Sequence, residues 1–244
     1  MIGNKKIRIQ KMLSECGVTS RRKAEKMVLD GLVTINGIKA KIGDTVDIET
    51  DKVRVSGHAI KTNKKNYYIM LNKPRGYIST TSDEIGRKCV VDLVSDIPAR
   101  VYPIGRLDKD SEGMLLLTND GDFANAVIHP SHHIEKKYRV TTHPNITEEQ
   151  LTKLSIGVEI DGRKATAHKI DVIASSKGRS VLEITLKEGR NRQIRKMCEA
   201  VGLEVARLRR VSIGQVKLGM LKIGHYRELT NDEIKNLKGK SSLK

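Results

Sequence analysis

Aromatic side chains are scarce in this sequence, which has no tryptophan, one phenylalanine and six tyrosines among its 244 residues. Proteins that hold single-stranded nucleic acid without sequence preference usually stack successive bases on aromatic rings. So few rings argue against such a platform as the main binding device. Any contact with nucleic acid must depend mostly on charge and shape.

Cysteines and long apolar runs are also few. The three cysteines, Cys16, Cys89 and Cys198, lie far apart and give neither a disulfide framework nor a paired-cysteine zinc motif. No stretch approaches the roughly 18 apolar residues of a membrane-spanning helix, and the N-terminus lacks the apolar core of a signal peptide. We expect a cytosolic protein, not bound to membranes, whose cysteines are reduced.

Acidic side chains are outnumbered by basic ones. The chain has 46 Lys or Arg against 29 Asp or Glu, a formal charge of +17. Clustered cations gain free energy by displacing counterions from phosphates, so nucleic acid is the first candidate partner. The excess is strongest in residues 1–65, with 15 Lys or Arg against seven Asp or Glu. This asymmetry predicts a dedicated N-terminal binding module.

The N-terminal segment has the pattern of two helices followed by a small sheet. Apolar residues recur at helical spacing over residues 9–13. A second helix is predicted after Thr19 or Ser20, either of which can cap it. Alternating apolar residues then lead to Asn36-Gly37, the strongest short signal for a hairpin turn.

Arg21, Arg22 and Lys23 occupy the first turn of the second predicted helix. Cations there oppose the helix macrodipole and cost roughly 0.3 to 1 kcal/mol each. A bound phosphate would reverse that sign, so we predict that these residues contact RNA or DNA and are not merely a solvated turn. The stretch "IRIQKMLSECGVTSRRKAEKMVLDGLVTINGIKA" resembles an S4 RNA-binding domain, a small αL-type module, over about residues 7–65. The resemblance implies RNA binding through the two-helix face.

A second domain is predicted from "KKNYYIMLNKPRGYIST" onward, where strand-like segments alternate with fewer helices and hairpin-length connections. This pattern favours an α+β fold with a mostly antiparallel mixed sheet. We divide the chain into the RNA-binding domain with its linker (1–65), a second domain (66–230) and a basic C-terminal tail that starts with a short helix (231–244). The predicted strands include Tyr68–Asn72, Lys136–Thr142, Ala167–Ile173 and Val181–Lys187, and the predicted helices include Asp122–Ile128, Thr147–Ser155 and Asn191–Val201.

Three acids, Asp108, Asp110 and Glu112, lie in a polar loop before the apolar run 114–117. Their spacing matches the first half of an EF-hand calcium loop, but Asn119 stands where a bidentate carboxylate is needed. A glycosidase with paired carboxylates is disfavoured too, because neighbouring acids in an extended loop point to opposite sides. Two alternatives remain: the acids cap turns and balance nearby cations, or one of them is a reagent.

The segment "LKEGRNRQIRKMCEAVG", residues 186–202, predicts a strand, a turn and a helix with one apolar face. Its other face would bring guanidinium groups to one region, although a solvated charged face is equally open. The charged face consists of Arg192, Arg195, Lys196 and Glu199.

The segment "HPSHHIEKKYRVTTH" raises two further possibilities. Its histidines, His129, His132 and His133, have no carboxylate or cysteine ligands at recognisable spacing, so we predict no metal site. Tyr138 begins a strand in basic surroundings. It could stack on a nucleic-acid base or simply pack against the sheet.

Taken together, "NKPRGYIST", "YPIGRLDKDSEGMLLLTNDG", "EKKYRV" and "KEGRNRQIRKM" resemble the motifs of the RsuA/RluB family of ribosomal RNA pseudouridine synthases. The resemblance spans essentially the whole chain. It implies an enzyme that isomerises a specific uridine without metal or cofactor, and it favours large-subunit over small-subunit rRNA. The implied partner is ribosomal RNA or a ribosomal-subunit precursor. We expect the protein to be a monomer.

The resemblance also implies a role for individual residues. Asp108 matches the aspartate that attacks the target uridine, Tyr138 the tyrosine that stacks on the base, and Arg195 the arginine that pairs with the aspartate. Asp110 and Glu112 would then only shape the turn. Arg106 resembles the residue that props open the RNA stack, and the other residues of this domain that we predict to bind RNA are Lys73, Arg75, Arg190 and Arg192.

Two other functions stay open on the sequence. A catalytically inactive RNA-binding factor for ribosome assembly could keep the fold without the reaction. A nucleotide hydrolase could use the same carboxylates. Pseudouridine mapping in a deletion strain separates the first from an enzyme, and released uracil or cleaved strands would identify the second.

Overall fold

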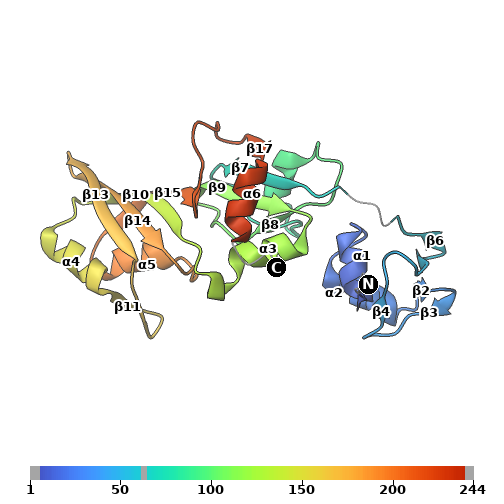
Figure 1. Ribbon diagram of the computed structural model, residues 1–244. Coiled ribbons are helices and arrows are strands. Elements are labelled where there is room, and N and C mark those ends of the chain that lie inside the picture. The colour runs from blue at the N-terminus through green and yellow to red at the C-terminus, as the bar shows by residue number, and fades with distance from the viewer. Residues whose placement is uncertain (1–5, 62–64, 240–244) are drawn as a thin grey trace. The chain divides into compact units, whose positions relative to one another are not determined.

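The computed structural model describes residues 6–61 and 65–239, which form two compact units (Figure 1). One unit extends to Asn66 and includes Asn119–Gly121. The other contains Tyr67–Thr118 and continues from Asp122. The division falls one residue beyond the boundary placed at residue 65 from the sequence. Among these described residues, no helix is long and apolar enough to cross a membrane.

The smaller unit packs two helices against short strands, as predicted. The Ser20 hydroxyl accepts a hydrogen bond from the backbone N–H of Lys23 and caps the second helix, and the Asn36-Gly37 turn joins two paired strands. The elements are β1 (Ile7–Arg8), α1 (Ile9–Glu15), α2 (Arg21–Leu29), β2 (Val33–Ile35), β3 (Ile38–Lys39), β4 (Thr45–Val46), β5 (Val53–Val55) and β6 (His58–Ala59). The strands pair in the orders β3-β2-β5-β6 and β1-β4.

The larger unit is built on one long sheet with the strand order β13-β14-β10-β15-β9-β7-β17. Its pairs are antiparallel except that between β9 and β15, so the mostly antiparallel mixed sheet is confirmed. The strands are β7 (Tyr68–Lys73), β8 (Tyr102–Ile104), β9 (Glu112–Thr118), β10 (Lys136–His143), β11 (Val158–Ile160), β12 (Arg163–Ala165), β13 (Lys169–Ser176), β14 (Arg179–Leu186), β15 (Glu204–Ile213), β16 (Val216–Lys217) and β17 (Tyr226–Glu228). The helices are α3 (Gly121–Ile128), α4 (Glu148–Ile156), α5 (Gln193–Ala200) and α6 (Asn231–Lys238), with short 3-10 turns η1 (Val90–Val94) and η2 (Pro130–His132).

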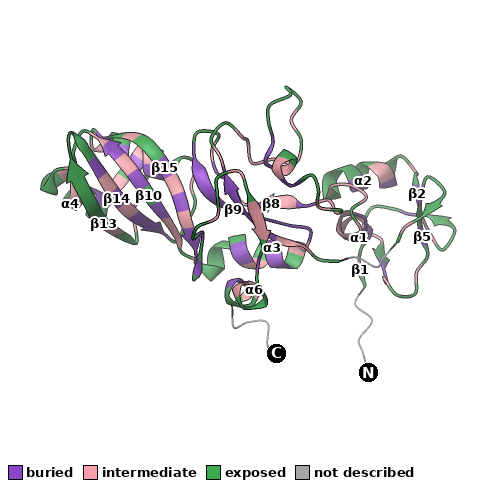
Figure 2. Ribbon diagram, turned by 90° about the horizontal axis from the view of Figure 1, so that it is seen from above, coloured by how far each residue is buried: buried purple, intermediate pink, exposed green. Residues whose placement is uncertain are grey.

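Apolar cores lie on both faces of this sheet. One contains residues of α4, α5 and η1, and the other contains residues of α3 and α6. All seven residues of β9 are buried between them, and Figure 2 shows this strand as continuous purple. Leu237 of α6 is 1% exposed, so the start of the predicted C-terminal tail is part of this core. Residues 240–244 of that tail lie outside the described residues.

Two predicted elements begin at different residues in the structure, and one central strand was not predicted. The strand predicted at Ala167–Ile173 is β13, Lys169–Ser176. The helix predicted from Asn191 begins at Gln193, because Arg192 has a left-handed backbone with φ +49°. Strand β15, ten residues long and central in the sheet, is absent from the predicted strands.

The two halves of the sheet join where β9 and β15 run parallel. Their register pairs Glu112 with Arg209 and Gly113 with Arg210. The backbones approach so closely that a Cβ on Gly113 would lie 2.3 Å from the carbonyl oxygen of Arg210. This short junction places the loop before β9 against residues of β10 and β15.

Candidate active site

Asp108 lies in the loop between β8 and β9, with its side chain 30% exposed. Together with Arg106 and Arg192 it lines two cavities of about 540 and 550 Å³. Tyr138 of β10 lines the second of these cavities. The structure thus brings together three predicted site residues. They are Asp108, the predicted nucleophile, Tyr138, predicted to stack on the base, and Arg106, predicted to prop open the RNA stack.

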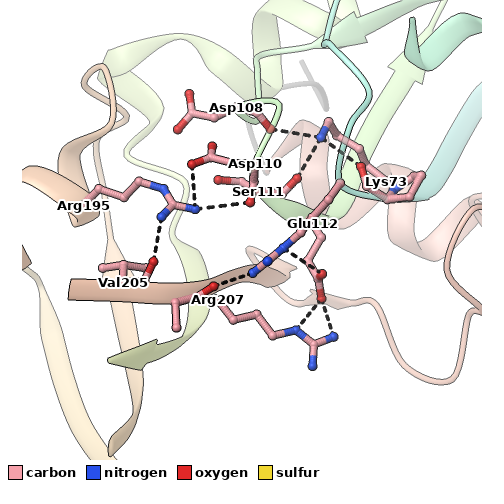
Figure 3. Close-up of polar contacts among 11 residues, drawn as sticks. Lys73, Asp108, Asp110, Ser111, Glu112, Arg195, Val205 and Arg207 are labelled. Atoms are coloured by element: carbon pink, nitrogen blue, oxygen red, sulfur yellow. Dashed lines mark hydrogen bonds and ion pairs between the residues drawn. The ribbon is translucent and has the colours of Figure 1, made fainter. Parts of the chain in front are cut away.

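Lys73, the last residue of β7, holds this loop from inside the protein (Figure 3). Its side chain is fully buried, and its Nζ donates hydrogen bonds to the carbonyl oxygens of Pro74 (3.1 Å), Asp108 (3.0 Å) and Ser111 (2.7 Å). In Figure 3 the Asp108 carboxylate points away from this amine. Lys73 therefore fixes the backbone of the loop through the carbonyl of Asp108 and not through its carboxylate. The amine is buried and donates to three carbonyl oxygens, which does not favour the predicted contact of Lys73 with RNA.

Burial lowers the pKa of Lys73 to about 8, although the charges of Asp110, Asp108 and Glu112 partly offset this effect. An unfolded lysine titrates near 10.4, so between about pH 8 and 10.4 the unfolded chain binds a proton that the folded protein does not. The free energy of unfolding should therefore rise with pH in this interval, by up to about 1.4 kcal/mol per pH unit.

This pH effect can be measured by urea unfolding of the wild type and of Lys73→Met, which lacks the titrating amine. The difference in unfolding free energy between the two proteins should move in favour of the wild type from pH 8 to 10. A difference that stays constant would mean that Lys73 keeps an ordinary pKa.

The two arginines near the loop are paired differently from the prediction. Arg192 Nη1 lies 3.6 Å from Asp108 Oδ2, whereas Arg195 Nη2 lies 3.1 Å from Asp110 Oδ2. Arg192 also contacts Asp110, at 3.2 Å. The left-handed backbone at Arg192 precedes α5, and Arg195 is one turn further along, where it also donates to the carbonyl of Val205 at 2.9 Å. The direct ion-pair partner of Asp108 is thus Arg192, whereas Asp110 forms ion pairs with both Arg192 and Arg195.

Glu112 likewise does more than shape a turn. Its side chain is 8% exposed, and Arg207 of β15 donates to Oε1 through Nε and Nη2 at 2.9 and 2.6 Å. Arg75 Nε lies 3.6 Å from Oε2, and Arg75 Nη2 donates to the carbonyl of Ala206 at 2.7 Å. Glu112 therefore ties β9 to β15 directly below the Asp108 loop (Figure 3).

The other arginines that are predicted to contact RNA differ in their exposure and in their hydrogen bonds to the protein. Arg106 is exposed beside Asp108, and Arg75 keeps 44% of its side chain exposed. Arg190 instead donates to the carbonyl oxygens of Ile160 (2.8 Å) and Lys164 (3.1 Å), which anchors its loop to the β11–β12 hairpin. Its guanidinium is thus held by protein carbonyls, which does not support the predicted RNA contact.

In the smaller unit, Arg21, Arg22 and Lys23 are exposed on the first turn of α2. Among the described residues, none of the three makes an ion pair, so the unfavourable placement against the helix dipole is not relieved within the protein. A phosphate at this turn would relieve it.

Three polar residues of the Tyr138 cavity were not identified from the sequence. Ser111, Lys136 and Arg210 all line it, and Arg210 is 5% exposed. Ser111 lies between Asp110 and Glu112 and belongs to no motif of its own. Arg210 lies in β15, which was not predicted from the sequence. The three histidines near this cavity form no metal-ligand cluster, nor does any other group of residues in 6–61 and 65–239.

Comparison with known proteins places this geometry in a family. The profile of the RNA pseudouridylate synthases matches residues 67–200, and that of the S4 domain matches residues 7–53. The chain belongs to the RNA pseudouridylate synthase family and carries an N-terminal S4 domain.

Individual relatives agree with this membership. The chain is 41% identical to ribosomal large subunit pseudouridine synthase B of Bacillus subtilis over 95% of both chains. It is also 41% identical to the dual-specificity RNA pseudouridine synthase RluF of Escherichia coli, over 97% of this chain and 80% of the relative. A crystal structure of a pseudouridylate synthase matches with a TM-score of 0.69 and 29% identity, covering 95% of this chain and 99% of that one.

Proposed function

We propose that this protein converts a specific uridine of large-subunit ribosomal RNA to pseudouridine, with Asp108 as the nucleophile. The observation that carries the proposal is an accessible carboxylate beside a cavity that also contains Tyr138, with its loop anchored by Lys73. The names of the Bacillus relative and of the family support the substrate class. We further propose that the protein acts as a monomer in the cytoplasm, on rRNA or on a precursor of the subunit.

The proposed reaction needs an accessible acid and a base taken out of its stack. Isomerisation breaks the C1′–N1 bond, turns the uracil and joins C5 to C1′. Asp108 either forms a bond to C1′ as the glycosidic electron pair passes to N1, or adds to C6 of the base. The carboxylate is regenerated, the proton on C5 is lost and one is gained at N1, so the mass of the RNA is unchanged. No electron is gained or lost.

The surrounding residues suit a flipped nucleotide. Unstacking costs a few kcal/mol, which contacts in the pocket must recover. Tyr138 would stack on the uracil, while Arg106 would fill the space that it leaves. Arg192 and Arg195 place positive charge beside Asp108 and Asp110, where a phosphate could replace one carboxylate.

The direct test uses the purified full chain and ribosomal RNA from a strain that lacks its gene. Pseudouridine mapping on both ribosomal RNAs should show new modification at one or a few sites of the large-subunit RNA, with strand length and mass unchanged. Bound but unmodified RNA would favour the inactive assembly factor. Free uracil or cleaved strands would favour the hydrolase.

The S4 unit should contribute binding through its exposed basic turn. Reversing Arg21 and Arg22 to Glu should weaken RNA binding and lower the slope of log affinity against log salt by about 2, because two phosphate contacts are lost. A filter-binding titration across salt concentrations measures both quantities. Reversal of the exposed Lys52 and Arg54 in the same unit is the charge-matched control. Equal slopes in the two double variants would contradict the assignment.

A further inference from the structure

Arg210 is a buried cation with one donor nitrogen that the protein does not satisfy. Its Nε donates to the carbonyl of Met114 at 2.7 Å, but its buried Nη2 has no hydrogen-bond partner. No carboxylate of the described residues forms an ion pair with it. A buried N–H without an acceptor is costly, more so on a charged group. An acceptor that arrives with a ligand would remove this cost.

The neighbours of Arg210 show where that ligand would lie. Arg210 is the direct cross-strand neighbour of Tyr138, and cross-strand partners project to the same face of a sheet. Ser111, 1% exposed, has a buried hydroxyl that also lacks a partner. Both residues line the cavity that contains Asp108 and Tyr138.

Lys136 adds a second positive charge to the same wall. It lies two residues before Tyr138 on β10 and lines the cavity. Burial, and then the charge of Arg210, lower the pKa of Lys136, and no carboxylate contact within the described residues offsets them. This wall therefore combines unpaired donors with excess positive charge, which suits a ligand rich in carbonyl oxygens.

We propose that Arg210 and Ser111 recognise the uracil ring itself, Arg210 donating to a ring carbonyl oxygen and Ser111 Oγ accepting from N3–H. The inference rests on the proposed function, since the ligand is the flipped base that Tyr138 would stack on. It adds a determinant of base identity to the residues that the sequence motifs indicate.

The symmetry of uracil explains why one donor is sufficient before and after rearrangement. A half turn about the axis through N3 and C6 exchanges N1 with C5, and it exchanges O2 with O4. A donor at one carbonyl and an acceptor at N3–H therefore meet the same pattern in both orientations. In cytosine, N3 carries no hydrogen and an amino group replaces O4. One orientation would then place that amino group against the guanidinium.

Binding of mononucleotides tests this recognition without any reaction. The wild-type full chain should bind uridine 5′-monophosphate at least about tenfold more tightly than cytidine 5′-monophosphate, because a site built around hydrogen bonds rejects an analogue that leaves them unmade. Arg210→Met should reduce the preference to about twofold or less, and Ser111→Ala should reduce it in part. Arg163→Met, the same change at an exposed residue of β12, should leave it intact. Equal affinities in the wild type, or a preference unchanged in Arg210→Met, would overturn the proposal.

Activity on rRNA separates this proposal from the proposed function. If the wild type forms pseudouridine, Arg210→Met should lower kcat by about 100-fold while affinity for the RNA changes by less than about threefold. Arg210→Lys, which keeps the charge, should recover part of the loss and remains informative if the Met variant does not fold. Wild-type inactivity would contradict the proposed function, whereas the mononucleotide preference would still decide the role of Arg210. Activity of Arg210→Met near the wild-type level would overturn that role.

Discussion

Replacing Asp108 with asparagine should abolish pseudouridine formation, lowering the rate by about 10,000-fold or more. The substitution keeps the size of the side chain and the backbone carbonyl that Lys73 binds, so the loop should keep its shape. It removes the carboxylate that, in the proposed reaction, forms a bond to the nucleotide. The measurement is single-turnover modification of rRNA from a strain that lacks the gene.

RNA binding by the Asp108→Asn variant should stay within about threefold of the wild type, because the S4 unit and the arginines around the cavity are untouched. Asp171→Asn, an equivalent change at a β13 carboxylate paired with Lys169, serves as control and should keep full activity. Residual activity of Asp108→Asn near the wild-type level would refute the assignment of the nucleophile. Loss of both binding and activity would point to a structural defect instead.

Substituting Gly113 by alanine should destabilise the larger unit by about 2 to 6 kcal/mol, since steric overlap and backbone strain each cost about 1 to 3 kcal/mol. The new Cβ would lie 2.3 Å from the carbonyl oxygen and 2.8 Å from the nitrogen of Arg210, and backbone atoms cannot swing aside as a flexible side chain can. The φ of +104° adds strain for any residue with a Cβ. Urea unfolding of the full chain measures the loss.

Gly178→Ala isolates the contribution of the close approach. Gly178 also has a positive φ, +74°, but nothing lies within 4 Å of the position of its Cβ. This variant should lose only the strain energy, about 1 to 2 kcal/mol. Equal losses in the two variants would show that β9 and β15 can separate to admit a methyl group.

Much of the fold was predictable because its signals are local. Helical spacing, the Ser20 cap and the Asn36-Gly37 turn each depend on residues close together in the chain, and the structure confirms them. Strand β15 was not predictable from the sequence, because Arg207, Arg209 and Arg210 interrupt its alternation of apolar and polar residues. Arg207 and Arg210 are compatible with a central strand because Glu112, the Met114 carbonyl and the cavity receive them, and such partners are far away in the sequence.

The sequence predicted which residues lie in the candidate site better than it predicted the contacts that they make. The motifs predicted that Asp108, Tyr138 and Arg106 belong to one site, and all three line the same cavity. They did not reveal that Lys73 is buried, since a lysine before a proline carries no local mark of burial. The arginine next to Asp108 also differs from the predicted one, because a single left-handed residue shifts the helix start and turns Arg192 toward the loop.

The parallel junction between β9 and β15 joins residues that are about 100 positions apart in the chain. Contacts of such long sequence separation close late in folding, because a large loop must first be ordered. During synthesis, at roughly 5 to 20 residues per second, β15 emerges about 5 to 20 seconds after β9. A ribosome-bound nascent chain that stops before residue 204 should therefore contain Asp108 and Tyr138 and yet lack β15, which supplies Arg210 to the wall of the cavity.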